Sequence, residues 1–180
     1  MTTFLALDFE TANHAPDSAC ALGMSVVADG RIVEETAFLI RPPSREFFFS
    51  YIHGLTWRDV QDAPSFADLW PGLRPYLEQA DYLVAHNAPF DMGVLAGCCA
   101  TYGLAPVPRP AVCTVRVARR VWGIHPTKLP DVCRRLGIDL KHHDAASDAA
   151  ACARILVRAL EAGWAPHKHP DARRGRRVLR

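Results

Sequence analysis

The sequence that decides the fold is Thr3-Phe4-Leu5-Ala6-Leu7-Asp8-Phe9-Glu10-Thr11, an apolar run that ends in two acids. Such a run, bounded by polar residues, predicts a buried β-strand over residues 4–9. Because side chains alternate along a strand, Asp8 and Glu10 are expected on the same face. Two neighbouring carboxylates repel each other and have raised pKa values unless a cation lies between them. A solvated face or a neutralising Arg would also explain this pair.

The rest of the chain predicts a sheet around this strand. Further strands are expected at residues 21–28, 31–40, 82–85 and 111–114, the first two joined as a hairpin by Asp29-Gly30. Helices are expected at residues 66–80, 90–102, 115–121, 128–136 and 145–160, with Thr56 and Ser65 as N-caps, and residues 44–55 as a loop. This order predicts an α/β fold with a mixed five-stranded sheet and helices on its faces.

Length and charge divide the 180 residues into a body and a tail. Residues 1–166 are expected to form a single domain, with 15 basic and 18 acidic residues and a net charge of −3. Residues 167–180 hold six basic residues and one acid without apolar periodicity, which predicts a flexible basic tail. An acidic body argues against binding a polyanion by charge alone.

Cysteine spacing and the start of the chain bear on the compartment. The six Cys include no Cys-x-x-Cys pair and lie mostly in apolar runs, which predicts reduced, buried thiols. An acid at position 8 interrupts the first apolar stretch before it could form a signal peptide or a membrane span. We therefore expect a cytoplasmic protein with no membrane partner.

Two more acids stand at junctions between elements. Asp91 follows the strand at 82–85 in the first turn of a helix, where an acid also complements the helix dipole. Asp148 lies inside an Ala-rich helix, five residues after His143, whereas Asp144 is better explained as the N-cap of that helix. Ligand sites of α/β sheets gather at strand ends, so these acids are candidates for the same site as Asp8.

The chemistry of these side chains indicates a metal site. Carboxylates without a Cys or His ligand cluster suit hard cations such as Mg²⁺ or Mn²⁺. Two such ions stabilise the attacking and leaving oxygens of an in-line phosphoryl displacement. His143, with an ordinary pKa of about 6.5, could accept the proton of the attacking water near neutral pH.

Three segments together resemble a known family. They are Asp8-Phe9-Glu10-Thr11, His86-Asn87-Ala88-Pro89-Phe90-Asp91, and His143 to Asp148. In order and content they resemble the three motifs of the DEDDh exonucleases, the histidine-bearing branch of the DEDD superfamily, which includes the proofreading subunit of bacterial DNA polymerase III. The resemblance covers about residues 3–160.

The resemblance implies an RNase H-like fold and 3′ to 5′ removal of nucleoside monophosphates with two Mg²⁺ or Mn²⁺ ions. The substrate would be the 3′ end of nucleic acid, with single-stranded DNA favoured and RNA possible. A polymerase or repair complex is the partner that the resemblance suggests.

The resemblance also assigns roles to residues. Asp8, Glu10 and Asp148 would hold the metal that positions the nucleophile, with Asp8 bridging to the second metal. Asp91 would contribute directly or through water. His143 would be the general base, because only His143, and not the neighbouring His142, has the family's five-residue step to the last acid.

Substrate contacts are expected from two places. Tyr51 to Thr56 matches a segment that lies near the 3′-terminal nucleotide in relatives, so His53 is a candidate, although a plain turn would also explain His53-Gly54. Thr11 and the backbone beside Phe9 would approach the terminal sugar. Many relatives have Thr-Gly after the first motif, whereas Ala12-Asn13-His14 follows Thr11 here, which leaves the substrate preference open.

Overall fold

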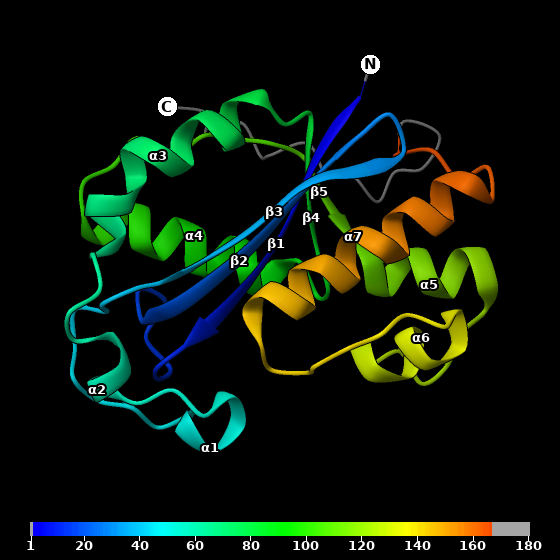
Figure 1. Ribbon diagram of the computed structural model, residues 1–180. Helices are drawn as coiled ribbons and strands as arrows, with labels where there is room; N and C mark the ends of the chain where they lie inside the picture. Colours follow the sequence, from blue (N-terminus) through cyan, green and yellow to red (C-terminus); the bar gives the residue numbers. More distant parts are fainter. Residues whose placement is uncertain (1, 167–180) are drawn as a thin grey trace.

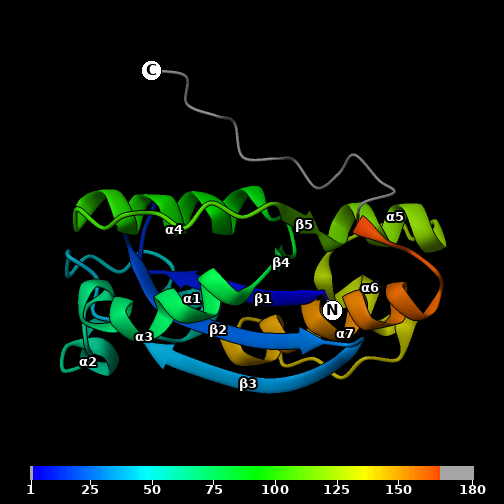
Figure 2. The same ribbon diagram turned by 90° about the horizontal axis from the view of Figure 1, so that it is seen from above.

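The strand that carries Asp8 and Glu10 lies at the centre of the sheet. The computed structural model describes residues 2–166 and contains a five-stranded sheet with the order β3-β2-β1-β4-β5 (Figure 2). β1 pairs antiparallel with β2 and parallel with β4, while β2–β3 is antiparallel and β4–β5 parallel. The mixed sheet is therefore confirmed. Its strands are β1 (Thr3–Thr11), β2 (Ala19–Ala28), β3 (Arg31–Leu39), β4 (Tyr82–Ala85) and β5 (Ala111–Cys113).

Helices cover both faces of this sheet (Figure 1). One face packs against α3 (Phe66–Gln79) and α4 (Pro89–Thr101). The other packs against α5 (Thr114–Trp122), α6 (Leu129–Leu136) and α7 (Ala145–Glu161). Each of these five helices lies within two residues of its predicted bounds.

The two faces of β1 belong to different cores. Leu5, Leu7 and Phe9 pack with residues of α3 and α4, whereas Phe4 and Ala6 pack with residues of α7. Because side chains alternate, Asp8 and Glu10 continue the row of Phe4 and Ala6. The face under α7 therefore changes from apolar to acidic at the end of the strand.

The segment between β3 and α3 differs from the prediction. Residues 44–55 were expected as a loop, but Ser50–His53 form the single-turn helix α1, so that expectation was wrong for these four residues. One turn is too short to show helical periodicity in the sequence. Thr56 caps α2 (Trp57–Val60) and Ser65 caps α3, as predicted. Each forms a capping box with the Asp three residues later.

The remaining expectations concern cysteines, the membrane and the tail. All six Cys are buried and free of disulfides, as predicted. Among residues 2–166, no helix has the length and apolar character needed to cross a bilayer. The predicted flexible tail at 167–180 lies outside the described residues.

Candidate active site

A glycine lets α7 approach the acidic end of β1. Gly23 of β2 pairs with Asp8, and a Cβ atom at this glycine would lie only 1.9 Å from the carbonyl oxygen of Ala145. A residue with a side chain would therefore separate the start of α7 from the sheet. Without one, the first turn of α7, which carries Asp148, lies directly against β2. Gly23 was not among the residues predicted for the site.

The predicted carboxylates converge at this contact. Asp8, Glu10 and Asp148 each offer an oxygen within 4.8 Å of the others. Glu10 is 9% exposed and Asp148 is 3% exposed, so these two carboxylates are shielded from solvent. Asp91, at the start of α4, is 1% exposed and lies outside this 4.8 Å group. Its Oδ1 accepts a hydrogen bond from the backbone N–H of Phe9 at 3.1 Å, which ties α4 to β1.

The carboxyl groups of the site have raised pKa values, because ionised neighbours repel one another in a buried place. Burial raises the pKa of Asp8 well above its ordinary value, and the nearby Asp91, Asp148 and Glu10 raise it further. Burial also raises the pKa of Glu10 to about 7, with Asp148 and Asp91 adding to the effect. The pKa of Asp91 rises to about 7 because of burial, although its bond from Phe9 opposes the shift.

The unpaired oxygens show what would stabilise the ionised cluster. Among the described residues, Asp91 Oδ2 and Asp148 Oδ1 are buried and have no hydrogen-bond partner. Buried polar atoms without a partner are costly, and a divalent cation would satisfy both carboxylates and reduce the repulsion. Oxygen donors of this kind suit Mg²⁺ or Mn²⁺, so the residues present fit the expected cofactor.

Two histidines close the site from the loop before α7. His142 Nδ1 lies 2.9 Å from Asp148 Oδ2, and the backbone N–H of His143 donates to the same oxygen at 3.1 Å. The two imidazole rings stack with centroids 3.8 Å apart. Burial lowers the pKa of His143, and the neighbouring His142 lowers it further, which favours a neutral imidazole. His143 was the histidine predicted for the site, whereas His142 had been set aside and its bond to Asp148 was not foreseen.

The histidine loop is held by the first turn of α7. His143 has a left-handed backbone with φ of 66°, a conformation that is uncommon for residues other than glycine. The Ser147 hydroxyl accepts a hydrogen bond from the backbone N–H of Lys141 at 2.8 Å. Asp144 caps α7 through Ser147 N–H, as predicted, and pairs with the Lys141 ammonium at 2.9 Å.

The predicted substrate contacts fall into different environments. His53 Nε2 donates to the carbonyl oxygen of Thr11 at 3.1 Å, and His53 lines a cavity of about 420 Å³ with Glu10 and His143. Thr11 lines a second cavity of about 360 Å³. The Phe9 ring is buried in the core beside Phe66, and its backbone N–H is donated to Asp91. The structure thus brings His53 to the site, places Thr11 in a cavity that none of the predicted carboxylates lines, and turns the ring of Phe9 into the core.

A network around His86 forms the opposite wall. Burial lowers the pKa of His86, which favours a neutral ring. Its Nε2 donates to the Thr127 carbonyl at 2.9 Å, because a carbonyl only accepts, and its Nδ1 accepts from the Thr114 hydroxyl at 2.8 Å. Arg119 Nε in turn donates to Thr127 Oγ1 at 2.7 Å. The motif contained His86, but its partners are distant in sequence and were not anticipated.

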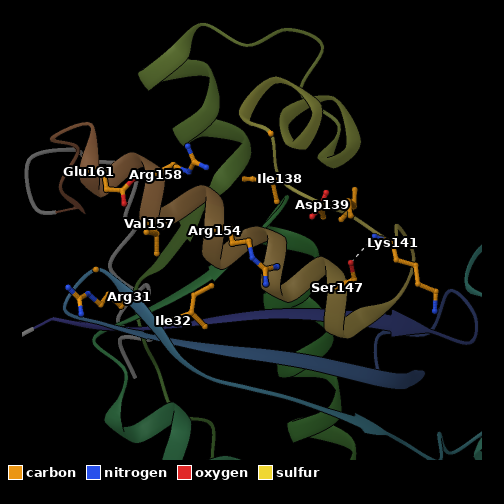
Figure 3. Close-up of a pocket in the computed structure, with 13 residues that line it drawn as sticks. Arg31, Ile32, Ile138, Asp139, Lys141, Ser147, Arg154, Val157, Arg158 and Glu161 are labelled. Carbon is orange, nitrogen blue, oxygen red and sulfur yellow. Dashed lines mark hydrogen bonds between the residues drawn. The ribbon is translucent and has the colours of Figure 1, made fainter.

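A larger cavity lies along α7 (Figure 3). It measures about 960 Å³ and runs along the helix past Ser147, Arg154 and Arg158. None of the predicted carboxylates lines it. The size of a cavity therefore does not identify the active site, which lies where the buried acids meet.

The fold and the site together define an RNase H-like α/β protein with a carboxylate cluster suited to divalent cations. A family model described as "Exonuclease" matches residues 5–156. The chain belongs to this exonuclease family, as the resemblance of its three motifs predicted.

Curated relatives agree with this membership. The chain is 32% identical over 164 residues to the PolC-type DNA polymerase III of Thermotoga petrophila, covering 88% of this chain and 12% of that protein. It is 30% identical over 154 residues to exodeoxyribonuclease 10 of Escherichia coli, covering 81% of this chain and 64% of that protein. The chain thus spans about an eighth of the first relative and less than two thirds of the second.

Solved structures show the same fold. Exonuclease X in complex with 5′ overhanging duplex DNA matches with a TM-score of 0.75 at 24% identity, covering 96% of this chain and 99% of that chain. The nuclease domain of 3′hExo, a DEDDh family member bound to rAMP, matches with a TM-score of 0.75 at 18% identity, covering 89% and 92%.

Proposed function

We propose that this protein is a metal-dependent 3′ to 5′ exonuclease that releases nucleoside 5′-monophosphates, with single-stranded DNA as the favoured substrate. The observation that carries the proposal is the meeting of Asp8, Glu10 and Asp148 under the first turn of α7, with Asp91 and His143 beside them. Family membership supports the same chemistry.

The carboxylates would hold two Mg²⁺ or Mn²⁺ ions. Asp8, Glu10 and Asp148 would bind one, Asp8 would bridge to the second, and Asp91 would contribute through its unpaired Oδ2. When bound, such ions stabilise the attacking and leaving oxygens of an in-line phosphoryl displacement. Two divalent ions would also change the formal charge of residues 1–166 from −3 to +1, which removes the objection to a polyanionic substrate.

His143 would act as the general base. A neutral imidazole at neutral pH accepts the proton of the water that attacks the phosphorus atom, while the bond to the 3′ oxygen of the preceding nucleotide breaks. That oxygen then takes a proton from solvent. His142, held by Asp148, would orient the carboxylate and the stacked His143 ring.

His53 and Thr11 would contact the 3′-terminal nucleotide. His53 lines a cavity with Glu10, and its bond to the Thr11 carbonyl joins the two segments. The Phe9 ring is buried, so any contact to the terminal sugar would come from the backbone near this residue.

Digestion of labelled strands tests the proposal. A 5′-labelled single-stranded DNA with Mg²⁺ should give a ladder of products shortened from the 3′ end, and a matched RNA reports the preference between the two. Intact DNA and RNA with either Mg²⁺ or Mn²⁺ would refute the proposal. Mononucleotides identified as 5′-monophosphates would support cleavage of the bond between phosphorus and the 3′ oxygen.

A proofreading role within a polymerase or repair complex is a second candidate. It is favoured by the PolC-type relatives, in which the matching segment is a small part of a much longer polymerase chain. Addition of a polymerase stalled at a mismatched 3′ end should then increase the rate of mismatch removal. We further propose that residues 1–166 form one exonuclease domain and that residues 167–180 assist nucleic-acid binding; the cytoplasmic location stays a prediction.

A further inference from the structure

Two cavities of the protein differ in chemistry. The cavity that contains Thr11 is lined by Phe49, Phe90 and other residues among which there is no Asp, Glu, Lys or Arg. The cavity that contains Asp8 and Asp148, of about 490 Å³, is instead lined by Arg119 and Lys128. An aromatic surface suits bases, whereas cations suit phosphates. The two cavities therefore suit different parts of a nucleic-acid strand.

The cationic side is held in place by the His86 network. Arg119 extends from α5, and its Nε bonds to the buried Thr127, whose carbonyl is held by His86. This bond uses one of the five N–H donors of the guanidinium and orients the others. Lys128 follows Thr127 directly at the start of α6. Among the described residues, neither cation forms an ion pair with a carboxylate.

We infer that Arg119 and Lys128 bind a backbone phosphate of the nucleic-acid substrate other than the one being cleaved. The inference rests on the proposed function, because the phosphate that reacts is assigned to the carboxylate cluster. The cavity joins that cluster through Asp8 and Asp148, so a strand whose scissile phosphate is bound there presents a neighbouring phosphate to the two cations. An Arg oriented by a second bond is well suited to a phosphate oxygen.

The larger cavity along α7 is less suited to this role. It is lined by Arg31, Lys141, Arg154 and Arg158, but Lys141 pairs with Asp144 and Arg154 pairs with Glu35. Figure 3 shows Arg31 and Arg158 at one end of the cavity and Lys141 at the other, so the charges do not converge. Arg158 therefore provides a matched control for a basic residue outside the proposed phosphate site.

The test compares Arg119→Gln, Lys128→Gln and their double variant with the wild type. Each substitution should raise KM for an oligothymidylate about 3- to 10-fold, with little change in kcat. The salt slope of oligonucleotide affinity, measured by fluorescence anisotropy with Ca²⁺ in place of Mg²⁺, should become shallower by about 0.7 for each phosphate that is no longer neutralised. Arg119→Lys should fall between wild type and Arg119→Gln, because it keeps the charge but not the oriented fork.

Arg158→Gln and Arg74→Gln serve as controls that remove an equal charge elsewhere. Arg74 lies on α3, on the other face of the sheet, where it pairs with Glu78. A double variant with wild-type KM and salt slope, or an equal effect of Arg158→Gln, would overturn the inference. Failure of the wild type to digest any oligonucleotide would refute the proposed function instead, and the anisotropy slopes would still decide whether the two cations bind phosphate.

Discussion

The two faces of β1 use alternate residues of one strand for opposite purposes. The face toward α3 and α4 is apolar from Leu5 through Phe9, whereas the face toward α7 changes from Ala6 to Asp8 and Glu10. The first face gains stability from burial, while the second buries charges that repel one another. The strand therefore gives up stability on one side to hold a site that a cation completes.

The largest effect is expected from Asp8→Ala, on the acidic face. Asp8 belongs to the carboxylate cluster and would bridge both metals, so its loss should abolish exonuclease activity. The chain should still fold, because a buried charge has been removed. Digestion of labelled DNA measures the activity, and calorimetry measures Mn²⁺ binding. Residual activity near the wild-type rate would exclude Asp8 as a metal ligand.

His143→Ala should lower kcat by about 10² to 10⁴-fold while metal binding is preserved, because a general base acts on the water and not on the metal. His142→Ala should lower kcat less, since His142 only orients Asp148 and the stacked ring. Single-turnover rates with both variants measure this difference. A larger loss in His142→Ala would reverse the roles, and an equal loss of Mn²⁺ affinity in His143→Ala and Asp8→Ala would contradict the assignment of a base.

On the apolar face, Leu7→Ala should lower the free energy of unfolding by about 2–5 kcal/mol, the cost of deleting a buried Leu side chain. Leu7 is 2% exposed and packs in the core with α3 and α4. Because it does not line the cavities beside the carboxylates, kcat of the folded protein should change little. Urea unfolding followed by circular dichroism measures the first effect. A kcat loss as large as that of His143→Ala would show that the two faces are not separable.

Gly23→Ala should affect both stability and activity. The added Cβ would contact the Ala145 carbonyl, so α7 must shift, at a cost of about 1–3 kcal/mol for overpacking. Asp148 would shift with the helix, and Mn²⁺ affinity should fall. Gly72→Ala on α3, where a Cβ meets nothing within 4 Å, is the matched control and should leave Mn²⁺ affinity intact. Unchanged affinity in Gly23→Ala would mean that the packing at this glycine does not position Asp148.

Gly23 also shows where sequence reasoning reaches its limit. The acids were found because Asp8 and Glu10 interrupt an apolar pattern, and the strands and long helices were found from periodicity. A glycine that matters only through a helix more than a hundred residues later leaves no local signal. The bonds joining His86, Thr114 and Thr127 are hidden for the same reason, since each depends on tertiary contact. The histidine loop was predicted only in part. The family's five-residue step identified His143, but the bond from His142 to Asp148 depends on loop geometry.

The smallest effect expected is a gain in stability of Glu10→Gln in the presence of a chelator. Burial raises the pKa of Glu10 from 4.5 to about 7, so the folded state holds this proton more tightly than the unfolded chain. The stability this gives is present at low pH and is lost as pH rises from 4.5 through about 7. At pH 8 the wild type should therefore be less stable than Glu10→Gln, by an amount on the order of 1 kcal/mol because neighbouring carboxylates share the proton.

The two faces should differ in this pH dependence. The difference between Glu10→Gln and wild type should vanish near pH 4, and saturating Mg²⁺ should reverse it, since a ligand that binds only the folded state stabilises it. Leu7→Ala should lose the same stability at pH 4 and pH 8, because no charge is involved. Thermal unfolding in chelator and in Mg²⁺ at both pH values measures all three proteins. If Glu10→Gln were destabilised in chelator at pH 8, the acidic face would contribute stability without a cation, and the contrast between the two faces would fail.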